Sequence, residues 1–179
     1  DRDPSEGPGK GGPLHVTAGW LRRDVVDSGV DAAAGLGYPQ TDDYNGADQE
    51  GVGQFQMTMR RGRRRSSAAA FLKPARQRKN LKIITGAQIR HLVMDGRRAT
   101  GVVYRQNGHD LTLLASREVV LSAGALGSPH LLMLSGIGDG MALRDKDIPV
   151  IHDLAGVGQN LQDHLQARPV FKTTASTIN

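Results

Sequence analysis

The amino-acid sequence predicts a mixed α/β fold. Three observations indicate it: apolar residues at helical spacing between residues 21 and 34, alternating apolar residues with hairpin turn signals from residue 81 onwards, and a strand, glycines and a helix around residues 119–138. The chain has 179 residues, of which 38% are hydrophobic but only 4% aromatic. Aliphatic side chains must therefore form most of the core.

The first part of the chain is expected to hold one helix between two loops. Residues 1–13 are polar and rich in Gly and Pro, which is typical of a loop. Apolar residues then recur at helical spacing, so we predict a helix from about residue 21 to 34, with Gly35 and Gly37 at its end. Residues 38–53 combine Pro, Asn-Gly and many acidic side chains, which is turn chemistry.

An arginine-rich segment follows. Residues 54–60 alternate and predict a short strand, and Ser66 is placed to cap an alanine-rich helix that Pro74 should end or kink. Residues 60–79 contain nine basic and no acidic side chains, within a net charge of +5. Such a run can contact phosphate groups, but no aromatic residue interleaves "RRGRRR". A solvated surface is therefore the preferred interpretation.

From residue 81 the pattern becomes β-rich. The segments "LKIIT", "QIRHLVMDG", "RATGVVYRQNG" and "DLTLLASREVVLSAG" read as strands, with hairpin turns at Asp95-Gly96 and Asn107-Gly108. They predict a β-meander followed by a buried strand over residues 119–122.

The stretch "GALGSPHLLMLSGIG", residues 124–138, predicts a helix directly after that strand. Ser128 serves as N-cap and Pro129 as first helical residue, three leucines supply a buried stripe, and Gly136 or Gly138 ends the helix. Glycine lets the main chain approach a ligand, and a helix N-terminus favours negative charge. These features are compatible with a cofactor or phosphate contact here. The alternative is a tight turn without a ligand.

The C-terminal part is expected to contain three short elements. Residues 148–154 predict a strand, residues 155–164 a tight glycine-rich turn, and residues 167–173 a final strand.

Composition and isolated signals narrow the chemistry. The sequence has no cysteine, which excludes thiolate metal sites and fits a reducing compartment, and its six histidines lack paired metal spacing. No apolar run reaches the ~18 residues of a membrane span, and the first residues lack the apolar core of a signal peptide. Adjacent side chains seldom face each other, so Asp163-His164 is better interpreted as structural than as an acid–base pair.

Motifs along nearly the whole chain resemble those of the glucose–methanol–choline (GMC) flavoprotein oxidoreductases, with the character of choline dehydrogenase-like and alcohol dehydrogenase-like members. In order, they are "GGPLHV", "GYPQTDDYNG…EGVG", "GRRRSSAAAFLKPA", "RKNLKIITGAQI", "GRRATGVVY", "REVVLSAGALGSP" and "GVGQNLQDH". The resemblance implies FAD as cofactor and oxidation of a primary alcohol, choline-like or other, to an aldehyde. Hydride would pass to the flavin while a histidine removes the hydroxyl proton.

The resemblance also implies cofactor-binding positions. Ile89 falls where the family's main chain meets the adenine edge, and Ser122, Ala123 and Gly124 fall at the strand end against the ADP part of FAD. Two further matches are interpreted as structural. They are Arg64 and Ser66 in a "G-x-R-x-S" landmark, and residues 160–164.

Two family landmarks do not occur in this sequence. One is the G-x-G-x-x-G strand–turn–helix that holds the FAD diphosphate: Gly7, Gly9 and Gly12 match its spacing but lack its strand and helix. The other is the C-terminal motif with the catalytic histidine. We therefore assign no catalytic residue and expect an internal fragment, truncated at both ends.

The resemblance divides the fragment into three parts. Residues 1–79 would belong to a substrate-binding domain, residues 80–165 to a FAD/NAD(P)-binding-type domain with the meander, and residues 166–179 to a return to the substrate-binding domain. The alternatives are a catalytically inactive truncated product and a basic nucleic-acid-binding module. We expect a cytoplasmic location, with membrane association through the electron acceptor as the alternative.

Overall fold

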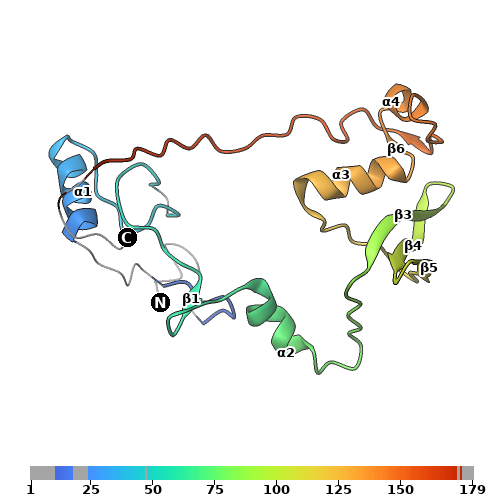
Figure 1. Cartoon of the computed structure of the whole chain (residues 1–179), viewed down its shortest axis with the longest axis horizontal. Coiled ribbons are helices and arrows are strands. Elements are labelled where there is room, and N and C mark those ends of the chain that lie inside the picture. Colours follow the sequence, from blue (N-terminus) through green and yellow to red (C-terminus); the bar gives the residue numbers. More distant parts are fainter. Residues whose placement is uncertain (1–10, 18–23, 47, 173, 175–179) are drawn as a thin grey trace. The chain divides into compact units, whose positions relative to one another are not determined.

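The computed structural model describes residues 11–17, 24–46, 48–172 and 174, and it divides the chain into two units (Figure 1). The first unit contains residues 1–82 and 169–179, and the second contains residues 83–168. The sequence predicts boundaries after residues 79 and 165. The boundaries between the units lie three residues later in both cases. Both units combine helices with small sheets, which confirms the mixed α/β class. Their assignment to a substrate-binding and a FAD-binding domain stays a prediction.

The first unit begins with helix α1 (Asp24–Gly35), which confirms the predicted helix; residues 21–23 lie outside the described part. Gly37 ends it with φ 96°. The N–H of Gly37 donates to the carbonyl of Ala34 (2.9 Å) and that of Tyr38 to the carbonyl of Ala33 (3.2 Å), which is a Schellman motif. The helix therefore stops at Gly37, one of the two glycines predicted at its end.

The acidic, turn-rich segment after α1 is an ordered loop. The N–H of Val52 donates to the carbonyl of Pro39 (2.8 Å) and closes it. The hydroxyl of Tyr44 accepts from the N–H of Gln56 (3.2 Å), and the Tyr44 ring meets that of Phe55 edge-on at 5.4 Å. These contacts join the two arms of the loop.

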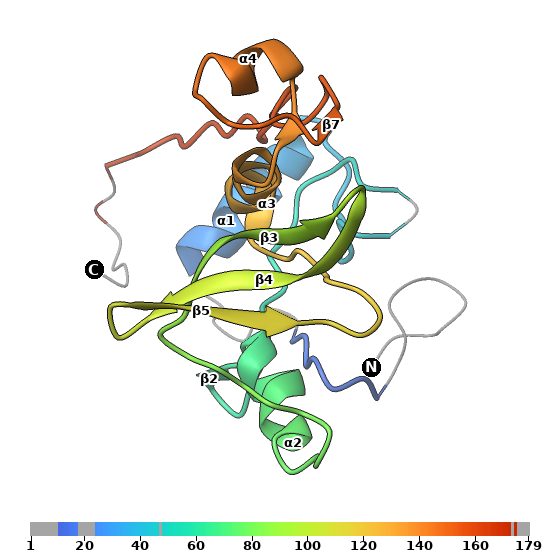
Figure 2. The same cartoon turned by 90° about the vertical axis from the view of Figure 1, so that its right-hand side faces the viewer.

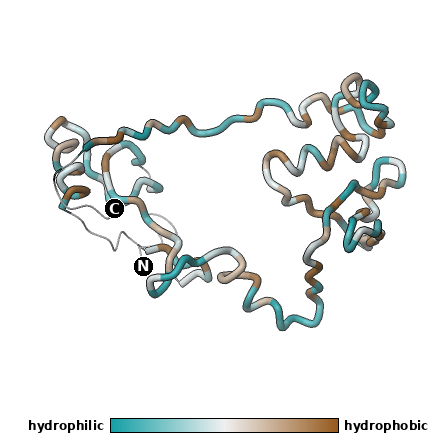
Figure 3. The backbone as a smooth tube through the Cα atoms, in the orientation of Figure 1, coloured by the Kyte–Doolittle hydropathy of each residue, from teal (hydrophilic) through white to brown (hydrophobic). Residues whose placement is uncertain are grey.

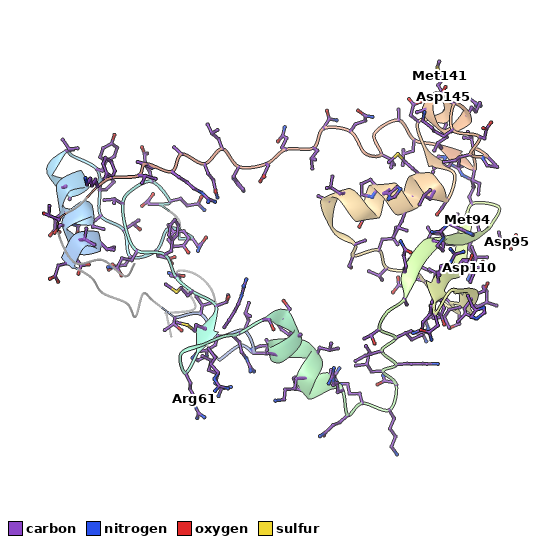
Figure 4. The ribbon with its side chains drawn as sticks, in the orientation of Figure 1. Arg61, Met94, Asp95, Asp110, Met141 and Asp145 are labelled. Carbon is purple, nitrogen blue, oxygen red and sulfur yellow. The ribbon has the colours of Figure 1, made fainter. Side chains whose placement is uncertain are left out.

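Two short strands contain three arginines of the basic segment. Strand β1 (Met59–Arg60) pairs with β2 (Arg63–Arg64) in a hairpin that places Arg60 opposite Arg63, so the strand predicted over residues 54–60 is only two residues long. The backbone trace of this hairpin is hydrophilic (Figure 3), and Arg61 at its turn points away from the ribbon (Figure 4).

The helix after the hairpin starts as predicted and ends one residue after its proline. The Oγ of Ser66 accepts from the N–H of Ala69 (3.3 Å), which is the predicted capping contact. A π-helical turn η1 (Ala68–Leu72) leads into α2 (Lys73–Ala75). Pro74 lacks an N–H and its ring crowds the carbonyl four residues before it, and the helix ends at Ala75, as the predicted end or kink at Pro74 requires.

The second unit is built on the predicted meander. Strands β3 (Gln88–Asp95), β4 (Arg98–Gln106) and β5 (His109–Leu114) form an antiparallel sheet in that order (Figure 2). Gly96 turns the first hairpin with φ 54°, and Asn107 and Gly108 turn the second with φ 51° and 81°. Two consecutive positive φ values define a type I′ turn, as the Asn-Gly pair predicts.

One cross-strand ion pair joins β4 to β5. The Nε of Arg105 lies 2.7 Å from an oxygen of Asp110 on exposed surface. The hydrogen bond from Arg105 lowers the pKa of the Asp110 carboxyl below its ordinary value.

Helix α3 (Gly124–Leu134) packs against β3, and two small elements follow it. Strand β6 (Ile137–Gly138) pairs in parallel with β7 (His152–Asp153), with α4 (Gly140–Arg144) between them in the chain. The carboxylate of Asp139 caps α4 by accepting from the N–H of Ala142 (2.8 Å). The buried apolar core of this unit is small and consists of Leu92 and Leu143.

Three predicted strands are wrong. Residues 119–122, 81–85 and 167–172 belong to no strand. A strand requires a neighbour for its backbone hydrogen bonds, and no described segment forms a ladder with any of them. The strand predicted over residues 148–154 is confirmed only at β7.

Candidate cofactor-binding site

Three of the expected cofactor contacts, Ser122, Ala123 and Gly124, form one exposed stretch at the start of α3. Gly124 has φ 84°, a left-handed conformation that glycine adopts without strain. A Cβ built on Gly124 meets no described atom within 4 Å. Glycine therefore suits this position because of the left-handed backbone. The space that a side chain here would enter is open.

Helix α3 begins at Gly124, four residues before the predicted start at Ser128-Pro129. Ser128 still supports the helix start, because its Oγ accepts from the N–H of Ala123 (3.0 Å). It thus bonds a backbone group before the helix rather than one after it. Pro129 lies inside α3, where its missing N–H leaves the carbonyl of Ala125 without the usual helical donor.

The start of α3 suits an anionic group. The first amides of a helix have no intrahelical acceptor, and the helix dipole adds partial positive charge there. The first turn of α3 carries no acidic residue that would oppose an anion. Residues 122–126 are exposed and the space beside Gly124 is open, so an anionic group such as the ADP part of FAD can be accommodated here, and its binding stays a prediction.

Ile89, the fourth expected contact, lies on β3 and is half-buried. It pairs with Tyr104 of β4, and the register shifts between Ile89 and His91. No hydrogen bond in the described part of the chain joins Ile89 to residues 122–124. Their connection runs through packing of α3 against β3.

Sequence reasoning missed Ser135, the residue that follows α3. It is 6% exposed, and its Oγ both donates to the carbonyl of Leu131 (2.6 Å) and accepts from the backbone N–H of Leu92 on β3 (2.8 Å). Gly136 after it has φ 79°, which confirms it as the helix stop. In the sequence, the dipeptide Ser-Gly indicates only a helix end. A hydrogen bond between residues 43 positions apart leaves no local signal.

The leucines of α3 were expected to form a buried stripe, and this is wrong. Leu131 and Leu132 are half-buried and Leu134 is 41% exposed. The helix is apolar on more sides than β3 covers.

The other two family-like motifs, around residues 64–66 and 160–164, make local backbone contacts. Arg64 pairs with Met59 in the hairpin, and Ser66 caps the helix start. The carboxylate of Asp163 accepts from the backbone N–H of His164 (2.8 Å). A structural role fits all of these contacts. In the described ranges, no three metal-ligating side chains gather, and no helix is long and apolar enough to cross a membrane.

Comparison with known proteins identifies the family of the chain. The profile of the GMC oxidoreductase family matches residues 6–166. Mouse mitochondrial choline dehydrogenase is 46% identical over 158 residues, which are 88% of this chain and 26% of the relative. The oxygen-dependent choline dehydrogenase of Rhizobium johnstonii is 48% identical over 158 residues, which are 88% and 29% of the two chains.

Solved structures show the same likeness. Pyridoxine 4-oxidase from Mesorbium loti superposes with a TM-score of 0.77 at 35% identity over 81% of this chain and 29% of its own. A FAD-dependent oxidoreductase from Chaetomium thermophilum gives 0.80 at 30% identity over 87% and 27%. The chain thus spans between a quarter and a third of the length of these relatives. Since the profile covers most of the sequence, the chain belongs to the GMC oxidoreductase family and is choline dehydrogenase-like.

Proposed function

We propose that this chain forms part of the FAD-binding region of an enzyme that oxidises a primary alcohol to an aldehyde by hydride transfer to FAD. The observation that carries the proposal is the combination of 46–48% identity to choline dehydrogenases with an exposed, acid-free helix start at Gly124. A choline-like alcohol is the preferred substrate, because both of these relatives bear that name.

Within this proposal, FAD supplies the hydride acceptor, and the chain's own residues bind and orient it. The amides of the first turn of α3 would hold the ADP part, with Gly124 giving the backbone its left-handed turn. The main chain at Ile89 would meet the adenine edge. No proton-transfer residue is assigned to this chain.

A graft tests the proposal. Residues 6–166 replace the matching segment of the Rhizobium johnstonii oxygen-dependent choline dehydrogenase, and flavin content and choline oxidation are measured. We expect a flavin-loaded, active graft. A folded graft without flavin would contradict the proposed cofactor role.

The isolated 179-residue chain is the matched control. We expect no turnover from it with FAD, a panel of alcohols and an artificial electron acceptor, because it spans less than a third of its relatives. Turnover above that of free flavin would show that the chain contains catalytic residues that we have not assigned.

A further inference from the structure

The strongest remaining feature is the hydroxyl of Ser135, the buried polar side chain of the described part of the chain. It forms two hydrogen bonds, one within α3 and one to the N–H of Leu92 on β3. A buried hydroxyl with both a donor and an acceptor contact is fully committed to one orientation. Ser135 therefore fixes the end of α3 to one point on β3.

That point lies on the free edge of the sheet. Among the strands of the described residues, β3 is the outer strand of this sheet and pairs with β4. Its register shifts both before and after Leu92, between Ile89 and His91 and between Val93 and Met94. The Leu92 N–H thus donates to the side chain of Ser135, the residue after α3, whereas in a central strand it would donate to another strand.

We propose that Ser135 is a positioning residue that sets the start of α3 relative to β3, and through it the two halves of the expected FAD contact; the FAD part of this inference rests on the proposed function. One half, Ile89, lies on β3 three residues before Leu92. The other half, residues 122–124, lies at the opposite end of α3 from Ser135.

Helix geometry shows why Ser135 acts at a distance. A helix rises 1.5 Å per residue, so Ser135 lies about 16 Å along the axis from Gly124 and does not reach a group held there. Over that length, a tilt of roughly 10° about the Ser135 end moves the Gly124 end by about 3 Å.

The absence of cysteine from the sequence makes the position of α3 directly measurable. Leu126→Cys on the first turn of α3, 73% exposed, and Thr112→Cys on exposed β5 carry two spin labels in the full 179-residue chain. The distance distribution between the labels is then measured by pulsed electron spin resonance. Ser135→Ala should shift or broaden it by about 3 Å, whereas Ser135→Thr, which retains the hydroxyl, should reproduce the parent.

Thr100→Ala is the matched control. The Oγ1 of Thr100 donates to the carbonyl of Val93 (3.2 Å), so its removal also deletes a hydroxyl contact to β3 without involving α3. We expect this variant to lose stability and to keep the parent distance. If Ser135→Ala keeps the parent distance too, Ser135 is merely structural and the proposal is wrong.

A backbone variant covers the case in which Ser135→Ala does not fold. An ester in place of the Leu92 amide removes the same hydrogen bond and leaves every side chain unchanged. It should displace the labels as Ser135→Ala does. An unmoved distance in the ester variant overturns the proposal.

The cofactor arm uses the grafted enzyme described above. Ser135→Ala should weaken FAD binding about tenfold, the scale of one buried hydrogen bond, while Thr100→Ala leaves it unchanged. If both variants weakened FAD binding equally, Ser135 would act only through the stability of the fold. A parent graft without flavin would instead contradict the proposed function, whereas the spin-label distances decide the positioning of α3 independently.

Discussion

Glycines with nearly the same left-handed backbone bracket α3, and replacing each by alanine should have different costs. Gly124 has φ 84° and Gly136 has φ 79°. Each replacement forces an L-residue into the left-handed region, at about 1–2 kcal/mol. At Gly124 the new methyl group meets nothing within 4 Å, so backbone strain is the whole cost of this replacement.

At Gly136 the methyl group also collides with the carbonyl of Pro149 and crowds Ile151, whose Cγ1 lies 3.1 Å from it. The chain cannot move away easily, because the Gly136 carbonyl accepts from the N–H of Ile151 (2.8 Å) and of His152 (3.1 Å). Overpacking of this kind costs about 1–3 kcal/mol more. Gly136→Ala should therefore destabilise the second unit by about 2–5 kcal/mol in all.

Urea unfolding followed through nuclear magnetic resonance signals of the second unit measures both variants against the parent. The difference between them isolates the steric contact with Pro149 from the backbone strain that they share. Equal losses of unfolding free energy would refute the reasoning, since they would mean that the segment around residues 149–152 yields without cost.

Three further outcomes are expected. Ser128→Ala should cost on the order of 1 kcal/mol of stability, because it removes the acceptor of the Ala123 N–H; an unchanged urea midpoint would contradict this. Residues 60–79 should bind duplex and single-stranded DNA only weakly, and this binding should disappear as the salt concentration rises. Tight, sequence-selective binding at physiological salt would favour a nucleic-acid module. The carboxyl of Asp110 should titrate below its ordinary pKa of 3.8, so the stabilisation from Arg105 is present above that value and is lost as the pH falls through the lowered pKa. A carboxyl resonance that titrates at the ordinary value would show that the ion pair does not persist.

Local chemistry explains what the sequence predicted well. Asn107-Gly108 and Gly96 specify hairpin turns by their own backbone preferences, so the meander and its order follow from residues close together in the chain. The same holds for α1 and for the cap at Ser66, where the deciding contacts span three to five residues.

The errors arise where distant contacts decide. The apolar run at residues 119–122 has the composition of a buried strand, but strand formation depends on a neighbour that composition does not reveal. The start of α3 is a different, local error: Ser128-Pro129 has the pattern of a helix start, yet the helix begins four residues earlier at Gly124. The bond from Ser135 to Leu92 depends on the docking of α3 and has no counterpart in the local sequence.

The two-residue turns of the meander also bear on how this chain folds in time. Every pairing within β3, β4 and β5 joins residues of adjacent hairpin arms, so each hairpin closes a short loop and can form on the microsecond scale. The bond of Ser135 to β3 and the parallel pairing of β6 with β7 require longer loops to close first. We therefore expect the sheet to form first and α3 to dock afterwards onto its edge.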